Sequence, residues 1–349
     1  MKAMLLKKPA PIEESPLALV NISEPNIGPK DILIKNSVCG VCHTDLHIIE
    51  GEIEMHKSPV IPGHQIVGQV YAIGNAVKKF GVGDRVGIAW LNSSCGICEF
   101  CKSGRENLCD SALFTGYDRD GGYTEFTAIS EDFAYPISNT FDDFHTAPLL
   151  CAGIIGYRAL KLCFGECGAT FMSQTLRDKS RTTTNERLGL YGFGASAHIV
   201  AQVAKYLGCE VYVFTRSENH KIFAKELGAV WTGFAEDSPP ELMDSSIVFA
   251  PSGKIVPAAL RVLKKGGTLA LAGIYMTPIP EMNYNLIYGE RIIKSVTNST
   301  RQDAMELLNL ALKIPIKTAV EVFPLKEANT VLKRLKNSKI RGSAVLDIS

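Results

Sequence analysis

The hydrophobic pattern of the chain changes near residue 150. Before that point, apolar residues occur in short runs punctuated by glycine and proline, as at residues 31–35 and 66–74; the second run alternates apolar with polar positions and ends in glycine. Residues 81–86 have the composition of a turn followed by another strand. Alternation and glycine punctuation of this kind predict half-buried strands. Many short strands together predict a β-rich domain that is barrel-like or sandwich-like.

After residue 150, short apolar runs alternate with segments of helical composition. The predicted strands are 188–191, 210–215, 246–250 and 267–272, and the predicted helices between them are 195–207, 220–227 and 255–263. An alternating βαβα order predicts a doubly wound parallel sheet with helices on both faces, as in a Rossmann domain. Two later helices, 301–313 and 325–335, precede a final strand at 344–348, which we expect to return to the first domain.

These patterns predict an α/β protein of two domains. We expect residues 1–152 to form the β-rich domain, with residues 298–349 completing it, and residues 153–297 to form the Rossmann domain. One segment fits neither pattern, because residues 164–187 are polar, lack a period and exceed the length of an ordinary connection. We expect an exposed loop insertion there.

Composition and charge narrow the function classes. The chain has 349 residues, of which 46% are apolar and 21% charged, so whole-chain disorder is excluded. Its 37 basic and 36 acidic residues give a net charge of +1, which argues against a nucleic-acid-binding protein or a polybasic membrane protein. We find no apolar run of about 18 residues and no apolar core of a secretory signal. We therefore expect no nucleic-acid or membrane partner and a cytoplasmic location, where clustered cysteines are more often metal ligands than disulfides.

Four of the ten cysteines form a close cluster. Cys95, Cys98, Cys101 and Cys109 have the spacing C-x2-C-x2-C-x7-C, with a glycine in the first gap. Four thiolates so close in sequence can form a tetrahedron around Zn²⁺ that leaves no open position. The bacterial iron–sulfur pattern differs, because its fourth cysteine comes after three residues and is followed by proline. The spacing therefore predicts a structural zinc site.

A second set of donors is spread along the chain. Cys42 lies in the segment CHTDLH, His64 in PGHQ and Cys151 in PLLCAG. Cysteine, histidine and cysteine make a three-ligand zinc set with one corner free for substrate. Spacing alone does not join these three residues, and three nearby side chains could each replace one of them. These alternatives are Cys39 for Cys42, and His43 or His47 for His64.

A family resemblance selects among these alternatives. The segments CGVCHTDLH, PGHQIVGQV, GDRVG, CGICEFCKSGRENLC, DGGYTEF and PLLCAG, with a later glycine loop, occur in order over nearly the whole chain. This sequence resembles the zinc-dependent alcohol dehydrogenases of the medium-chain dehydrogenase/reductase family. The resemblance implies a GroES-like catalytic domain in which Cys42, His64 and Cys151 hold the catalytic zinc. It also implies that the four clustered cysteines hold a structural zinc.

The same resemblance implies roles for the residues around the catalytic zinc. Thr44 and His47 correspond to a proton relay that runs from the threonine through the cofactor ribose to the histidine. Asp45 corresponds to the acid that accepts a hydrogen bond from the free nitrogen of His64. Simple helix capping is the alternative for Thr44 and Asp45. Gln65 departs from the family, which usually has glutamate there, and we expect an intact zinc site with altered ligand exchange.

A glycine-rich segment predicts a dinucleotide site. Gly192, Gly194 and Ala197 fit G-x-G-x-x-G/A between a predicted strand and a predicted helix. In this motif the first glycine makes the tight turn, the second lets the backbone approach the pyrophosphate, and the small third residue permits close helix packing. The helix N-terminus then faces the phosphates.

The end of the next predicted strand bears on the choice of cofactor. NAD enzymes usually carry an acid there that accepts from the ribose 2′-hydroxyl. Here Thr215 and Ser217 offer hydroxyls, and Arg216 and Lys221 offer positive charge for a 2′-phosphate. Glu218 comes one turn late for the usual contact. We therefore predict a preference for NADP(H) over NAD(H).

The predicted function is reversible oxidation of primary alcohols or reduction of aldehydes by an enzyme with two zincs per chain, as a homodimer or homotetramer. The resemblance implies that His43 and Arg341 contact the pyrophosphate and that Trp90 lines the substrate pocket. We expect the active site in a cleft beyond the carboxyl ends of the parallel strands. The alternatives are a polyol dehydrogenase, a zinc-free quinone reductase, which the three donors disfavour, and a nucleotide-binding protein with a decayed site.

Overall fold

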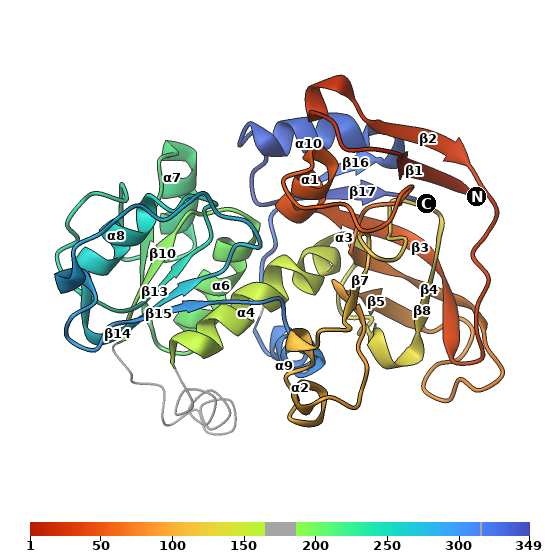
Figure 1. Cartoon of the computed structure of the whole chain (residues 1–349), viewed down its shortest axis with the longest axis horizontal. Helices are drawn as coiled ribbons and strands as arrows, with labels where there is room; N and C mark the ends of the chain where they lie inside the picture. Colours follow the sequence, from red (N-terminus) through yellow and green to blue (C-terminus); the bar gives the residue numbers. More distant parts are fainter. Residues whose placement is uncertain (165–185, 315) are drawn as a thin grey trace. The chain divides into compact units, whose positions relative to one another are not determined.

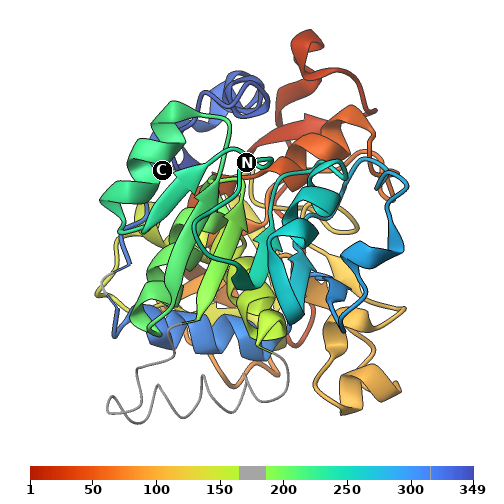
Figure 2. The ribbon, with the colours of Figure 1, turned by 90° about the vertical axis from the view of Figure 1, so that its left-hand side faces the viewer.

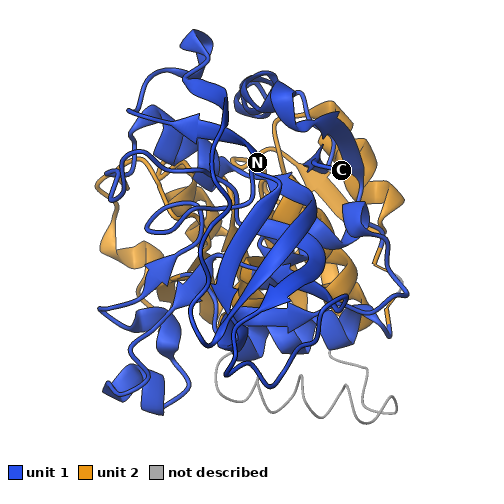
Figure 3. Cartoon of the chain, turned by 90° about the vertical axis from the view of Figure 1, so that its right-hand side faces the viewer, with its two compact units in different colours: residues 1–154, 298–313, 317–349 blue, residues 155–297, 314–316 orange. Residues whose placement is uncertain are grey.

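The computed structural model describes residues 1–164, 186–314 and 316–349, and these form two compact units (Figure 3). Unit 1 consists of Met1–Ile154, Asn298–Lys313 and Lys317–Ser349, and unit 2 of Ile155–Thr297 and Ile314–Ile316. The first boundary follows residue 154 rather than residue 152, and the three residues 314–316 join unit 2. Most of the expected insertion at 164–187 lies outside the described residues.

Unit 1 is built on a mixed sheet of seven strands. The strand order is β16-β17-β3-β4-β5-β9, and β8 also pairs with β3. The pairs are antiparallel except β16 with β17, and β17 pairs with β3, so the last strand of the chain joins a sheet begun near its start (Figure 1). The strands are β3 (Asp31–Val41), β4 (Gln65–Ile73), β5 (Arg85–Ile88), β8 (Phe126–Ser130), β9 (Ala134–Pro136), β16 (Val320–Pro324) and β17 (Ser343–Asp347).

Smaller elements complete unit 1. Two further sheets each pair two strands, β1 with β2 and β6 with β7. Their strands are β1 (Lys2–Leu6), β2 (Leu17–Asn21), β6 (Leu91–Ser93) and β7 (Leu113–Phe114). The helices are α1 (His43–Glu50), α2 (Glu99–Lys102), α3 (Asp143–Thr146), α9 (Arg301–Ala311) and α10 (Ala328–Lys336). The 3-10 helices are η1 (Ile12–Glu14), η2 (Glu106–Leu108), η3 (Glu131–Phe133), η4 (Ala147–Leu150) and η7 (Leu325–Glu327).

The pairing of β3 with β4 brings two distant segments together. Gly40, near the end of β3, pairs with Gln65, the first residue of β4. Both strands are mostly buried, and their apolar side chains belong to the core of unit 1. The residues that follow β3 and the residues that precede β4 therefore meet at one end of the sheet.

Unit 2 contains a parallel sheet of six strands in the order β12-β11-β10-β13-β14-β15. Numbered within the unit, this is the 3-2-1-4-5-6 order of a doubly wound sheet, so the predicted fold class is confirmed. Helices α6 and α7 contact β10–β12 and helix α8 contacts β10, β13 and β14; Figure 2 looks onto this unit. The strands are β10 (Arg187–Tyr191), β11 (Glu210–Phe214), β12 (Trp231–Gly233), β13 (Met243–Val248), β14 (Leu263–Leu271) and β15 (Ile292–Ser295).

Short helices connect the strands of unit 2. They are α6 (Ala195–Tyr206), α7 (Glu218–Glu226), α8 (Ile255–Arg261) and the 3-10 helix η6 (Tyr284–Leu286), while α4 (Ala152–Cys163) begins in unit 1. The strand predicted at 246–250 begins earlier, at Met243, and β15 was not predicted at all.

Within the described residues, no single helix is long and apolar enough to cross a membrane. The bent pair of helices Asp143–Leu150 and Ala152–Cys163 meets the length and composition requirement only when the two are taken together.

Candidate metal centres and nucleotide loop

Three donor atoms converge where β3 ends and β4 begins. Cys42 follows β3, His64 precedes β4, and Cys151 follows η4. His64 Nε2 lies 3.2 Å from Cys42 Sγ and 3.3 Å from Cys151 Sγ, and all three donors lie within 4.8 Å of one another. Zinc bonds of about 2.3 Å to sulfur and about 2.0 Å to nitrogen would separate such donors by about 3.5 Å in a tetrahedron. The three donors therefore fit zinc and leave its fourth position open.

The electrostatics of this centre favour a cation. Burial alone would raise the pKa of the Cys42 thiol, but the hydrogen bond from Cys151 and the charge of His64 lower it well below its usual range. Burial likewise opposes charge on His64, yet the charges of Cys42 and Asp45 raise the pKa of its imidazole to about 10. The three donors thus stabilise positive charge between them, and a divalent metal ion would supply it.

Asp45 connects helix α1 to His64, the histidine of the three-donor group. Its Oδ2 accepts a hydrogen bond of 2.9 Å from the backbone N–H of Cys42, which closes the N-terminal cap of α1. Its Oδ1 lies 3.1 Å from His64 Nδ1 and accepts from the backbone N–H of Gly63 at 3.3 Å. One carboxylate therefore caps the helix and also lies next to the His64 ring, which are the two features that the sequence presented as alternatives.

The candidate relay residues lie on the first two turns of α1. The backbone N–H of Thr44 donates to Cys42 Sγ at 3.3 Å. His47 is buried, and its Nδ1 lies 2.5 Å from Oε2 of Glu52, whose side chain is 39% exposed. Sequence reasoning missed Glu52; the available signal is Gly51, whose left-handed conformation (φ 76°) ends the helix and turns the chain back toward His47.

The alternative donors lie outside the three-donor group. Cys39 is buried, and its thiol donates to the carbonyl oxygen of Gly40. His43 is exposed at the start of α1, with its ring centroid 6.2 Å from that of His47. Gln65 is buried, and its Nε2 has no hydrogen-bond partner in the described part of the chain.

Aromatic side chains border His64. Trp90 meets the His64 ring edge-on, with centroids 4.8 Å apart. Phe114 and Tyr117 stack on Trp90 at 5.2 and 5.8 Å. The sequence suggested Trp90 alone; Phe114 and Tyr117 follow it by more than 20 residues, and no spacing pattern marks them.

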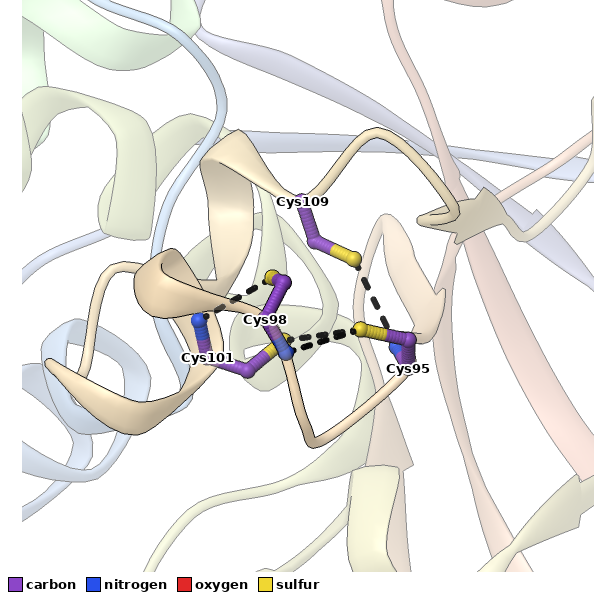
Figure 4. A group of neighbouring side chains, drawn as sticks. All are labelled: Cys95, Cys98, Cys101 and Cys109. Carbon is purple, nitrogen blue, oxygen red and sulfur yellow. Dashed lines mark hydrogen bonds between the residues drawn. The ribbon is translucent and has the colours of Figure 1, made fainter.

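The clustered cysteines point toward a common centre in residues 95–109, which we call the cysteine lobe (Figure 4). Their four sulfurs lie within 4.8 Å of one another, and Cys95 Sγ is 3.9 Å from Cys101 Sγ, close to the sulfur spacing of about 3.8 Å around tetrahedral zinc. Backbone N–H groups of Cys98 and Cys101 donate to the sulfurs of Cys95 and Cys98 at 3.3 and 3.4 Å. Donation from the N–H groups of Ile97 and Cys98 lowers the pKa of Cys95 to about 6, which favours the thiolate that binds metal.

The cysteine lobe has little apolar interior. None of the residues in α2 is buried. A buried carboxylate joins the lobe to α9 instead, because Glu106 Oε1 accepts from the backbone N–H of Arg301 at 2.9 Å and from its Nε at 3.2 Å. This contact spans 195 residues, and sequence reasoning missed it.

The glycine loop of unit 2 fits a dinucleotide. Gly192 has a φ of 89°, and a Cβ there would come within 3.3 Å of the Ala250 nitrogen. Gly194 is the N-terminal cap of α6, and a Cβ there would meet no atom within 4 Å, so open space lies beside its backbone. Ala197 is fully buried, and His198 Nδ1 donates to the carbonyl oxygen of Gly194 at 3.1 Å. The open space beside Gly194 leaves room for a phosphate at the start of α6.

The side chains after β11 differ in how freely they could meet a ligand. Thr215 is buried, and Ser217 Oγ accepts from the backbone N–H of His220 at the start of α7. The Lys221 ammonium lies 2.8 Å from Glu218 and 3.7 Å above the Phe234 ring. Arg216 is exposed, and no ion pair or hydrogen bond joins its side chain to the described residues.

Arg341 lies far along the chain from this loop, in unit 1. It precedes Gly342 and β17, and its backbone N–H donates to Oε1 of Glu321 at 2.8 Å. Its side chain is exposed.

Comparison with known proteins shows family models over both halves of the chain. The model of the alcohol dehydrogenase GroES-like domain matches residues 28–139, and that of the zinc-binding dehydrogenase matches residues 197–313. A probable alcohol dehydrogenase, AdhA, of Mycobacterium tuberculosis is 43% identical over 352 residues, which cover 99% of this chain and 97% of that protein. An alcohol dehydrogenase of Geobacillus stearothermophilus is 34% identical, with 95% and 96% covered.

Solved structures that resemble this chain also include alcohol dehydrogenases. A cinnamyl alcohol dehydrogenase from Sorghum bicolor superposes with a TM-score of 0.86 at 27% identity, covering 99% of this chain and 97% of that one. The structure of CAD from Helicobacter pylori complexed with NADP(H) has a TM-score of 0.84 at 26% identity, covering 100% and 99%.

Proposed function

The chain belongs to the zinc-dependent alcohol dehydrogenases of the medium-chain dehydrogenase/reductase family, and from that premise we propose that it transfers a hydride between NADP(H) and a primary alcohol or aldehyde. Membership of this family implies alcohol dehydrogenase or aldehyde reductase activity, zinc and a nicotinamide cofactor. The predicted family and reaction type are therefore confirmed. The NADP(H) preference, the substrate class and the individual residue roles are proposals.

One observation carries the proposal, namely the three-donor centre of Cys42, His64 and Cys151. Two sulfurs of half-buried cysteines and one nitrogen of a buried histidine meet there, with no fourth protein donor among the described residues. A structural zinc normally has four protein ligands, whereas a catalytic zinc has three and keeps one position for substrate.

We assign movement of the proton to residues of α1 and its C-terminal turn. Bound at this centre, zinc would supply Lewis acidity toward an alcohol or carbonyl oxygen, and the nicotinamide would accept or donate the hydride. The Thr44 hydroxyl would accept the proton of a bound alcohol while giving up its own, and His47 would be the group that finally receives a proton and passes it to solvent. The partly exposed Glu52 beside His47 Nδ1 supports release to solvent. Aldehyde reduction uses the same path in reverse.

The proposed NADP(H) preference rests on the end of β11. Arg216 is exposed and carries a charge that nothing described neutralises, whereas Lys221 is already paired with Glu218. No acid occupies the position that would accept from a ribose 2′-hydroxyl. Thr215 and Ser217 would supply hydroxyls. At the pyrophosphate, the open backbone of Gly194 supports binding at the start of α6, and His43 and Arg341 remain proposed contacts by resemblance.

We also propose a second zinc in the cysteine lobe.

A further proposal is a self-association surface on unit 2. Strand β15 is an edge of the six-stranded sheet, and its outer side has no described partner strand. Tyr284, Tyr288 and Ile292 nearby are between half and two-thirds exposed. A second copy pairing antiparallel through this edge would cover the open backbone groups and the apolar side chains, which favours a homodimer or a homotetramer built from it.

A steady-state screen of primary alcohols and aldehydes with NADP(H) and NAD(H), with zinc analysis, tests the function. We expect turnover, a higher kcat/KM with NADP(H), and about two zincs per chain. Cys42→Ala should lose turnover and one of the two zincs. Cys39→Ala removes a buried thiol outside the donor group, and it should keep its turnover and both zincs. Full turnover in Cys42→Ala would contradict the site, and faster turnover of sorbitol than of simple primary alcohols would contradict the substrate class.

A further inference from the structure

A buried tyrosine contacts the carboxylate that holds the histidine ligand. Tyr123 has no exposed surface, and its hydroxyl donates to Asp45 Oδ2 at 3.1 Å. Asp45 is also fully buried, and its other oxygen lies 3.1 Å from His64 Nδ1. A continuous chain of polar contacts therefore runs from the tyrosine through the carboxylate to the imidazole whose Nε2 faces the two sulfurs.

Tyr123 is held from several sides, so its hydroxyl has a defined direction. Its backbone N–H donates to the carbonyl oxygen of Pro62 at 3.0 Å, and its carbonyl oxygen accepts from the N–H of Met4 at 2.9 Å. Its ring lies against Gly63, where a Cβ would come within 2.4 Å of Tyr123 Cδ1. The residue just before the histidine ligand is thus packed against the ring whose hydroxyl reaches Asp45.

The hydroxyl supplies something that neither the ring nor the backbone supplies. A carboxylate can rotate about its last bond, and a donor aimed at one oxygen restricts that rotation. Asp45 Oδ2 takes donors from Cys42 and Tyr123, which leaves Oδ1 facing His64 and Gly63. Outer contacts of this kind orient a ligand and strengthen metal binding.

We propose that Tyr123 is a positioning residue of the three-donor metal centre: its hydroxyl orients the Asp45 carboxylate, and through it the His64 ring. The proposal rests on the proposed function only in taking this centre as a zinc site. It concerns metal binding and not the identity of the alcohol, so it can be tested without a substrate.

The experiment uses Tyr123→Phe, which removes the hydroxyl and keeps the ring against Gly63. Zinc release from the loaded protein to a chromogenic chelator should show two classes of zinc. We expect affinity at the three-donor centre to fall about tenfold, with the cysteine-lobe zinc unchanged. In protein carrying cobalt(II) at the three-donor centre, the visible absorption bands should shift, because the ligand geometry changes.

Tyr191→Phe is the matched control. Tyr191 is also fully buried, but it lies in unit 2 and its hydroxyl has no hydrogen-bond partner in the described residues. It should leave the zinc affinity and the cobalt spectrum unchanged. Asp45→Asn should weaken zinc binding on its own, and adding Tyr123→Phe to it should cost little more, because both act through one carboxylate.

The outcomes separate the two proposals. If Tyr123→Phe lowers thermal stability but leaves the zinc affinity and the cobalt spectrum as in the parent protein, Tyr123 is a core residue only and the inference is wrong. If the metal readouts shift as expected while the parent protein turns over no alcohol or aldehyde, the inference stands and the proposed function fails.

Discussion

Single side chains in this protein serve more than one purpose, and sequence patterns tend to show only one of them. Asp45 has the type and position of a helix-capping residue, and it caps α1. The same carboxylate lies beside His64 of the three-donor group. Ser217 shows the reverse case, because a hydroxyl considered for cofactor binding also accepts a hydrogen bond at the start of α7. Arg216 stands out because no such internal contact occupies its side chain in the described structure.

Arg216→Ala should therefore change cofactor selectivity. We expect the ratio of kcat/KM for NADP(H) to that for NAD(H) to fall about tenfold or more, because a charge-assisted contact to the 2′-phosphate contributes about 1.5–3 kcal/mol. Steady-state kinetics with both cofactors measures this ratio. Lys221→Ala is the comparison, since its ammonium is already paired with Glu218, and it should change the ratio less. A ratio unchanged by Arg216→Ala would remove the basis for the NADP(H) preference.

Elements of similar size are stabilised in different ways. Helix α1 buries a continuous stretch from Asp45 to Ile49 in unit 1, whereas α2 in the cysteine lobe buries nothing. The Glu106–Arg301 contact anchors the lobe, and the proposed zinc would add stability that apolar packing does not supply there. In unit 2, α6 buries His198 next to the glycine loop. Because burial disfavours the protonated imidazole, we expect the start of that helix to be sensitive to acid.

Cys98→Ser should remove the cysteine-lobe zinc. We expect metal analysis to find about one zinc fewer per chain and the Tm to fall by about 5 °C or more, because the lobe has no apolar core to replace the metal. Cys209→Ser changes a buried thiol outside both donor groups and should keep the full zinc content. Unchanged zinc in Cys98→Ser would show that the lobe is not a metal site.

His198 should contribute to acid sensitivity. Burial lowers its pKa to about 4, against about 6.5 in an unfolded chain. The folded state therefore takes up its proton later as pH falls, so stability is complete above about pH 6.5 and declines between that value and about pH 4. The loss from this group by pH 5 is about 2 kcal/mol.

Urea unfolding at pH 7 and pH 5 checks the effect of His198. His198→Gln should lose less stability between the two pH values than the parent protein, by about the same amount. His145→Gln, which removes a half-exposed histidine of unit 1, should follow the parent. Equal acid destabilisation of His198→Gln and the parent would mean that this histidine is not kept neutral by the fold.

At the scale of the whole molecule, the open edge at β15 predicts self-association. Ile292→Lys places a charge on this edge strand, and we expect it to shift the protein toward monomer in analytical ultracentrifugation, because a lysine opposes strand pairing across the edge. Ile222→Lys is the control, since Ile222 is similarly exposed but lies on α7. An identical sedimentation profile for Ile292→Lys and the parent protein would place the interface elsewhere.

How much the sequence predicted depends on the distance over which residues act. The βαβ order, the turn at Gly192 and the cysteine spacing are local, and each has a pattern that a sequence displays. The joining of Cys42 to Cys151 came from family resemblance, because no spacing rule covers it. The contact of Tyr123 with Asp45 and the edge strand β15 were not foreseen, since both depend on how distant segments pack.

The contact between Glu106 and Arg301 has a consequence for biosynthesis. A ribosome adds about 5–20 residues per second, so the 195 residues between them take about 10–40 s to make. During that interval the cysteine lobe exists on the nascent chain without its anchor on α9. All four ligands of the proposed lobe zinc lie at or before residue 109, so the site could bind its metal in this interval, and thiols without metal would be open to oxidation. For the proposed lobe zinc, the timing of zinc supply during translation would therefore matter as well as its amount.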